Sequence, residues 1–203
     1  MNQTIIYEVH NGLYINLTNR CPCNCAFCVR RQADGINQDE SLWLDHEPTL
    51  EEIERAIHSV DLSRYEEVVF CGYGEPCERL DALIATAKLV KKMAPAVPIR
   101  LNTNGLSDLI NHKRTAPLLA DCIDHVSISL NAPDKETYNK LCRPAFGEES
   151  FDALLRFALD CKDLIPEVNF SVVDVLDADQ LQVCQKLSDG LGISLRIRKR
   201  EDV

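Results

Sequence analysis

The sequence of 203 residues contains no long apolar run, no low-complexity stretch and no Gly/Ser-rich linker. No segment approaches the roughly 20 continuous apolar residues of a membrane helix, so we expect no membrane span. Without a linker or a shift in composition, we expect one domain over residues 1–203. The chain opens Met-Asn-Gln-Thr and shows no basic segment leading into an apolar run. We therefore expect no secretory leader and a cytoplasmic location.

Basic residues are also scarce, because 22 Lys and Arg face 32 Asp and Glu, giving a net charge of −10 and a pI of about 5.0. A broad electrostatic grip on phosphate backbones requires clustered Lys and Arg, so this composition argues against nucleic acid as a partner. One local exception is the C-terminal run with Arg196, Arg198, Lys199 and Arg200. Along a strand, its three arginines would share one face, where a solvated strand end and an anion-binding site both remain open.

Ten cysteines are present, and three of them, Cys21, Cys25 and Cys28, have the spacing C-x3-C-x-Phe-C. No second C-x2-C pair, H-x3-H pair or spaced histidine follows, which argues against a four-ligand zinc site. Iron–sulfur cubes are normally held by four Cys thiolates, so three would leave one iron open to another ligand. Cys23 could replace Cys21 by position alone, but we interpret it as a free thiol. The spacing thus favours an iron–sulfur site with an open coordination position.

Strand-like and helix-like segments alternate along the chain, as in an α/β protein. The strand-like segments are Leu13 to Leu17, Glu67 to Cys71, Ile99 to Asn102, His125 to Leu130, Val168 to Val173 and Ser194 to Ile197. Helical periodicity covers residues 50–60, 80–87, 151–158 and 181–191. Thr49 and Glu52 form a capping box for the first of these, and Ser150 or Asp177 could cap later ones. Residues 1–11 read as a short extended lead-in, and residues 29–48 as a long functional loop or lid.

Each strand-like segment is followed by an unusual polar segment. These are residues 21–28, 72–76, 102–105, 129–133, Asp174 and the basic C-terminal run. The carboxyl ends of the strands are where β/α barrels build their active sites. The sequence therefore favours a partial (β/α)6 TIM-type barrel with parallel strands, open on one side, over an open doubly wound sheet.

Taken singly, the polar segments after the second and third strands are weak signals. Gly74 tolerates positive φ and allows close approach of a ligand, and Glu75 offers a carboxylate to an ammonium group, yet a plain turn fits as well. The Asn102–Gly105 segment is a turn or a set of amides for hydroxyls and amines. Ser129 and Asn131 alternate with Ser127 and should share one face of a buried strand. The remaining cysteines are interpreted as core packing, with Cys77 nearest the Glu75 loop: Cys71, Cys77, Cys122, Cys142, Cys161 and Cys184.

Together, C-x3-C-x-Phe-C, the Gly-Glu-Pro loop on the second strand and the partial barrel resemble the radical S-adenosylmethionine (radical SAM) superfamily over residues 12–202. The resemblance implies that Cys21, Cys25 and Cys28 ligate a 4Fe–4S cluster, whose unique iron binds SAM. It further implies a SAM site formed by Phe27 beside adenine, Gly74 and Glu75 at the methionine ammonium, Asn102 and Asn104 lining the site, Ser129 and Asn131 near the ribose or carboxylate, and Arg143 at the carboxylate. Tyr73 stands where the family usually has glycine.

The implied reaction is reductive cleavage of SAM to a 5′-deoxyadenosyl radical, which abstracts hydrogen from an unidentified substrate, small molecule or protein. The class is oxidoreductase or lyase-like, and the resemblance implies an electron donor such as a flavodoxin or ferredoxin. More closely, residues 13–21, together with Leu42-Trp43-Leu44 and Glu47-Pro48, resemble the small radical SAM proteins associated with TatD-family hydrolases. A carboxydeazaguanine synthase or a glycyl-radical activase remains open. So does a non-catalytic iron–sulfur or zinc protein.

Six strands also leave a lateral opening in the barrel. We expect a bulky substrate or a partner protein to close it. Packing of the chain's own loop 29–48 into the gap would contradict this hypothesis.

Overall fold

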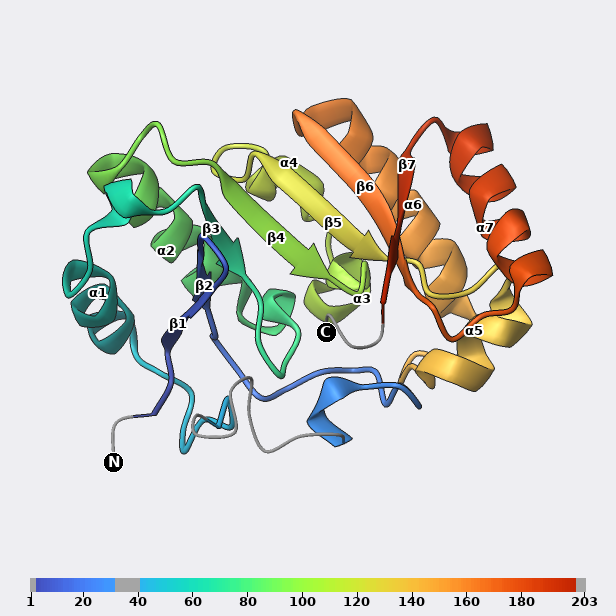
Figure 1. Ribbon diagram of the computed structural model, residues 1–203, viewed down its shortest axis with the longest axis horizontal. Coiled ribbons are helices and arrows are strands. Elements are labelled where there is room, and N and C mark those ends of the chain that lie inside the picture. The colour runs from blue at the N-terminus through green and yellow to red at the C-terminus, as the bar shows by residue number, and fades with distance from the viewer. Residues whose placement is uncertain (1–2, 32–40, 200–203) are drawn as a thin grey trace.

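One sheet of seven strands organises the computed structural model, which describes residues 3–31 and 41–199 (Figure 1). The strands follow one another across the sheet in chain order: β1 (Ile6–Val9), β2 (Gly12–Ile15), β3 (Glu67–Phe70), β4 (Ile99–Thr103), β5 (His125–Ser129), β6 (Glu167–Val173) and β7 (Ser194–Arg198). Strands β2 to β7 are mutually parallel, and β1 and β7 form the two edges of the sheet. The expected partial barrel of six parallel strands, open on one side, is confirmed.

The N-terminal segment differs from the expected lead-in. Residues Ile6–Val9 form a strand that pairs antiparallel with β2, with Val9 opposite Gly12. The two-residue turn between them places His10 in the left-handed region, at φ 51°. A run of β-branched and aromatic residues next to an unpaired edge of the sheet favours this hairpin.

Helices lie along one face of the curved sheet (Figure 1). They are α1 (Leu50–His58), α2 (Leu80–Met93), α3 (Ser107–Asn111), α4 (Ala116–Leu119), α5 (Lys135–Cys142), α6 (Glu149–Leu164) and α7 (Ala178–Leu191), with 3-10 turns η1 (Val29–Arg31), η2 (Leu62–Arg64) and η3 (Pro76–Arg79). Within the described residues, no helix combines the length and apolarity needed to cross a membrane.

Two of the three expected helix caps are confirmed. Thr49 and Glu52 form the capping box of α1, and Asp177 caps α7 through the backbone of Gln180. The expectation for Ser150 is wrong, because α6 begins at Glu149 after Glu148 and places Ser150 inside the helix. Its hydroxyl is buried without a hydrogen-bond partner. Ser150 therefore fills space between α6 and its neighbours instead of satisfying a free backbone amide.

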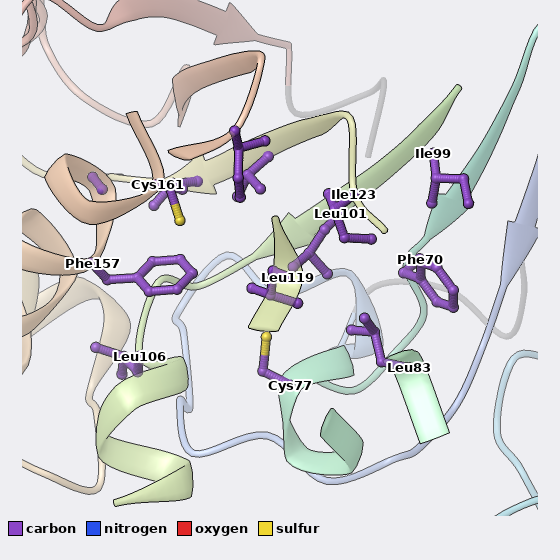
Figure 2. Packing of buried hydrophobic residues seen from close by; sticks show 14 of the residues in the cluster. Phe70, Cys77, Leu83, Ile99, Leu101, Leu106, Leu119, Ile123, Phe157 and Cys161 are labelled. Atoms are coloured by element: carbon purple, nitrogen blue, oxygen red, sulfur yellow. The ribbon is translucent and has the colours of Figure 1, made fainter. Parts of the chain in front are cut away.

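The core lies between the sheet and the helices (Figure 2). Phe70 and Leu101 point from the strands toward the helices, where Leu83 and Phe157 belong to the same cluster. Packing is confirmed for most of the cysteines assigned to it, namely Cys77, Cys122, Cys142, Cys161 and Cys184. Cys71 is the exception, because it is half-buried and lies outside this cluster.

The opposite, inner face of the sheet is polar. Its register places Tyr14, Val69 and Arg100 side by side across β2, β3 and β4. The alternate residues of these strands belong to the core, so these three side chains face away from the helices. The inner face therefore carries side chains that the helices do not cover.

The described ends of the long loop pack against the first strands. Leu42 is buried with Tyr7 and Tyr73, and Trp43 lies edge-on to Tyr73 at 5.2 Å between ring centroids. The Arg30 guanidinium lies 5.9 Å from the centre of the Trp43 ring, so the two ends of the loop are joined. Residues 32–40 lie outside the described residues. Closure of the lateral opening by another molecule stays a prediction.

Candidate active site

The loop after β2 runs across the carboxyl ends of the strands and is held at both sides. On one side, the backbone amide of Glu75 donates to the carbonyl of Arg20 at 2.8 Å. On the other, the end of α5 accepts two backbone hydrogen bonds, from Asn24 to Cys142 at 3.0 Å and from Ala26 to Leu141 at 2.8 Å. These contacts fix the segment that contains the spaced cysteines between the β3 loop and α5.

Cys21, Cys25 and Cys28 are all half-buried free thiols on this loop. Cys23 is only 5% exposed, and its sulfur forms hydrogen bonds with both Cys21 and Cys25. Over residues 3–31 and 41–199, no three His, Cys, Asp or Glu side chains are arranged as a metal site. The structure thus places the three cysteines on one loop, and their sharing of one cluster stays a prediction.

Hydrogen bonds among these thiols favour the ionised form at two positions. The Cys142 thiol, followed by that of Cys23, lowers the pKa of Cys25 to about 4. A hydrogen bond from Cys23 likewise lowers the pKa of Cys21. Cys23 has a raised pKa, because its proton is shared with Cys21 and Cys25 and it is buried. The thiolate is the form of cysteine that binds metal, so the loop favours metal binding at Cys21 and Cys25.

Asn104 joins the β4 loop to the thiols. Its Nδ2 lies 3.9 Å from the sulfur of Cys21 and 3.8 Å from that of Cys23. Its Oδ1 accepts a hydrogen bond from the amide of Leu106 at 2.9 Å, which sets the direction of the side chain. The amide hydrogens of Asn104 therefore face the sulfur atoms, where they would stabilise negative charge on a thiolate.

Glu75 connects the β3 and β4 loops from a buried position, with 3% of its surface exposed. Its carboxylate accepts hydrogen bonds from the Thr103 hydroxyl and the Asn104 amide, both at 2.7 Å, and from the Cys77 amide at 3.2 Å. Burial raises the pKa of this carboxyl group, although the hydrogen bonds oppose the shift. The structure thus gives Glu75 a role in shaping the site, and contact with an ammonium group stays a prediction.

Gly74 is required by close packing and not by the positive φ that the sequence suggested. It is absent from the left-handed residues, and an added Cβ would lie 2.2 Å from the carbonyl oxygen of Thr18 and 2.6 Å from that of Arg20. Tyr73, which replaces the usual glycine, is 4% exposed and packs against Trp43. The side chain of Tyr73, just before Gly74, thus points toward Trp43 of the long loop.

The other expected site residues occupy the same end of the sheet. Asn102 accepts a hydrogen bond from Arg100 at 3.3 Å, and Ser129 is the last, half-buried residue of β5. Asn131 does not continue the strand alternation, because its φ of 57° turns the chain there. Arg143 ends α5 in the left-handed region and is exposed. Phe27, at the end of the cysteine loop, packs partly against the core.

Two residues near the thiols were not expected from the sequence. Cys142, which the sequence assigned to packing, also forms a hydrogen bond with Cys25. Tyr138 is buried with its hydroxyl hydrogen-bonded to Cys23, and burial raises its pKa well above the usual range. Both lie on α5, one turn apart. Their spacing of four residues, which places them on one helix face, is the feature of the sequence that could have identified them. The sequence does not show that this face of α5 contacts the cysteine loop, because that depends on where α5 packs.

A partial barrel with free thiols and amide groups at the carboxyl ends of its strands is typical of β/α proteins that build a site at this end of the barrel. The family model of the Radical SAM superfamily matches residues 15–178. The chain therefore belongs to the radical SAM superfamily and is an enzyme of that superfamily. Its cofactors are a 4Fe–4S cluster and SAM.

Individual proteins resemble parts of the chain. A GTP 3′,8-cyclase of Corynebacterium glutamicum (strain R) is 36% identical over 142 residues, which cover 67% of this chain and 35% of that protein. Streptococcus suis SuiB bound to precursor peptide SuiA has a TM-score of 0.68 at 15% identity, over 96% of this chain and 40% of SuiB. The structure of anSMEcpe with bound AdoMet has a TM-score of 0.64 at 20% identity, over 92% and 50%. The chain thus spans about a third of the curated relative's length, and the solved structures support the fold.

Proposed function

We propose that Cys21, Cys25 and Cys28 bind the 4Fe–4S cluster and that the inner face of the sheet receives the substrate. The observation that carries this proposal is the cysteine loop, held across the carboxyl ends of the strands by the Glu75 loop and by α5. Held by these cysteines, the cluster would supply, together with SAM, the radical chemistry that removes hydrogen from a substrate. The protein must bind, orient and shield the reacting groups.

The residues around the loop fit these cofactors. The three spaced thiols are free, and two of them have lowered pKa values. The Oδ1 atom of Asn131 is buried without a hydrogen-bond partner in the described part of the chain, so it can accept from a ribose hydroxyl. Asn131 lies at the strand end where the resemblance places the ribose. An orphaned acceptor at this position supports the proposed SAM site.

The SAM site would be formed from several strand ends, by Phe27, Gly74, Glu75, Asn102, Asn104, Ser129, Asn131 and Arg143. Glu75 fixes the β4 loop through the Asn104 amide, so the carboxylate holds Asn104 in place beside the thiols. The exposed Arg143 guanidinium can pair with the methionine carboxylate. Phe27 offers an aromatic face on the edge of the core.

A nucleotide substrate is a second, finer proposal. It is favoured by the 36% identity to a protein named GTP 3′,8-cyclase. The alternative is a substrate specific to the small TatD-associated proteins that residues 13–21 resemble. We also propose an electron donor such as a flavodoxin or ferredoxin. A reducing compartment such as the cytoplasm suits ten free cysteines.

The test is anaerobic reconstitution of the cluster, reduction, addition of SAM, and chromatography for 5′-deoxyadenosine and methionine. We expect both products from the wild-type chain and neither from Cys25→Ala. Cys184→Ala, a core cysteine remote from the loop in sequence, serves as the matched control and should retain cleavage. A wild-type protein with full iron and sulfide content that yields neither product would identify a non-catalytic iron–sulfur protein.

A further inference from the structure

Three arginines share the inner face of the sheet in a chain whose net charge is −10. Arg100 lies on β4, while Arg196 and Arg198 lie on β7, opposite Ser171 and Val173 of β6. The alternate β6 residues Phe170 and Val172 belong to the core on the other face. Both β7 arginines therefore face the inside of the partial barrel.

The three guanidinium groups also lie near one another. Arg196 and Arg100 act electrostatically on Arg198, as do Tyr14 and Cys71. Tyr14 belongs to β2, and Cys71 follows β3 directly. The side chain of Arg198 thus reaches from one edge of the sheet toward strands near the other edge. This proximity depends on the curvature of the sheet.

Arg100 already has its counter-ion. Its guanidinium forms two hydrogen bonds with the carboxylate of Glu67, at 2.6 and 2.9 Å. It also donates to the hydroxyl of Tyr14 at 3.2 Å. Because the Glu67 carboxylate accepts these hydrogen bonds and balances the charge of Arg100, this arginine does not need a second anion.

Arg198 has no such partner among the residues that the structure describes. Its Nε is buried without a hydrogen bond, and no ion pair between described residues includes Arg196 or Arg198. Burial and the two neighbouring guanidinium groups lower the pKa of Arg198. Leaving a buried N–H donor of a charged side chain unpaired is costly, and an anion is a suitable acceptor for it. Such a cost is typical of a site completed by a ligand.

We propose that Arg196 and Arg198 bind an oxyanion group of the substrate, a phosphate or a carboxylate, on the inner face of the sheet. The fork of N–H donors in arginine matches both groups. Arg198 ends β7, so the anion would sit at the carboxyl end of the sheet, next to the candidate active site. This inference rests on the proposed function, because it describes the substrate of the same site.

The test uses the full chain with its cluster reconstituted, titrated anaerobically by calorimetry with pyrophosphate and, separately, with succinate. We expect at least one probe to bind, and Arg198→Gln and Arg196→Gln to weaken that binding about tenfold or more. Arg156→Gln, an exposed arginine on the outer helix α6, is the matched control and should bind within about twofold of wild type. The binding probe tells phosphate from carboxylate recognition.

The proposal is overturned if the wild-type chain binds neither probe, or if Arg198→Gln binds like Arg156→Gln. Far-UV circular dichroism establishes that each variant is folded. If Arg198→Gln fails to fold, Arg198→Lys keeps the charge without the fork and should still weaken binding; unchanged binding contradicts the proposal. SAM cleavage by the wild-type chain is measured in parallel. If the wild-type chain cleaves SAM but binds neither anion, only this inference is contradicted. If it binds an anion but does not cleave SAM, the proposed function is contradicted.

Discussion

At the scale of single residues, the environment of each thiol separates the four cysteines of the loop. Cys21, Cys25 and Cys28 are half-buried, whereas Cys23 is 5% exposed and belongs to the core. A hydrogen bond from Cys23 lowers the pKa of Cys21, and the pKa of Cys25 is lowered first by Cys142 and then by Cys23. The interpretation of Cys23 as a thiol outside the cluster stays a prediction, and the structure adds its contact with both neighbours.

The first prediction concerns cluster retention. Replacing Cys21, Cys25 or Cys28 by Ala removes a proposed ligand, so each variant should lose its iron and sulfide after reconstitution and desalting. Cys23→Ala should retain both, because its sulfur is not among the proposed ligands. Iron and sulfide analysis with visible absorption provides the measurement. Loss of the cluster in Cys23→Ala with retention in Cys21→Ala would reverse the assignment.

The second prediction concerns Gly74. A methyl group there would meet the carbonyl oxygens of Thr18 and Arg20 at 2.2 and 2.6 Å, so Gly74→Ala should lower the free energy of unfolding by about 1–3 kcal/mol. Gly190→Ala is the control, because nothing lies within 4 Å of its added Cβ in α7. It should raise the free energy of unfolding by about 0.5–1 kcal/mol. Urea unfolding of the chain tests both, and equal effects would contradict this packing.

At the scale of elements, the residues of the candidate site lie in the loops that follow the strands. The cysteine loop follows β2, the Glu75 loop follows β3 and Asn104 follows β4. Hydrogen bonds between these ends, such as that from the Asn104 amide to Glu75, then assemble the site. The positions of these ends could be predicted, because short apolar strands and polar loops alternate in the sequence. The hydrogen bonds between them could not, since they depend on the pairing of neighbouring strands.

The third prediction concerns the caps of α7 and α6. Asp177 accepts a hydrogen bond from the amide of Gln180, so Asp177→Ala should lower the free energy of unfolding by about 0.5–2 kcal/mol. Ser150→Ala is the counterpart inside α6, where the hydroxyl has no partner. Its removal should be neutral or stabilising. Thermal unfolding distinguishes the two variants, and a larger loss for Ser150→Ala would restore it as a cap.

At the scale of the whole molecule, the curvature of the sheet determines which groups meet. The alternation of strands and helices predicts a partial barrel, and the periodicity of each strand predicts which residues share a face. It does not predict that Arg198 of β7 approaches Tyr14 of β2, since five strand pairings separate them. Nor does it predict β1, because a short segment becomes a strand only where an edge accepts it.

The account depends most on a cluster with one iron open to SAM. The direct measurement is the electron paramagnetic resonance spectrum of the reduced, reconstituted chain before and after SAM is added. We predict a 4Fe–4S spectrum that changes on addition of SAM and that is absent from Cys25→Ala. A wild-type cluster whose spectrum is unchanged by saturating SAM, or a full cluster in Cys25→Ala, would contradict the proposed three-cysteine site.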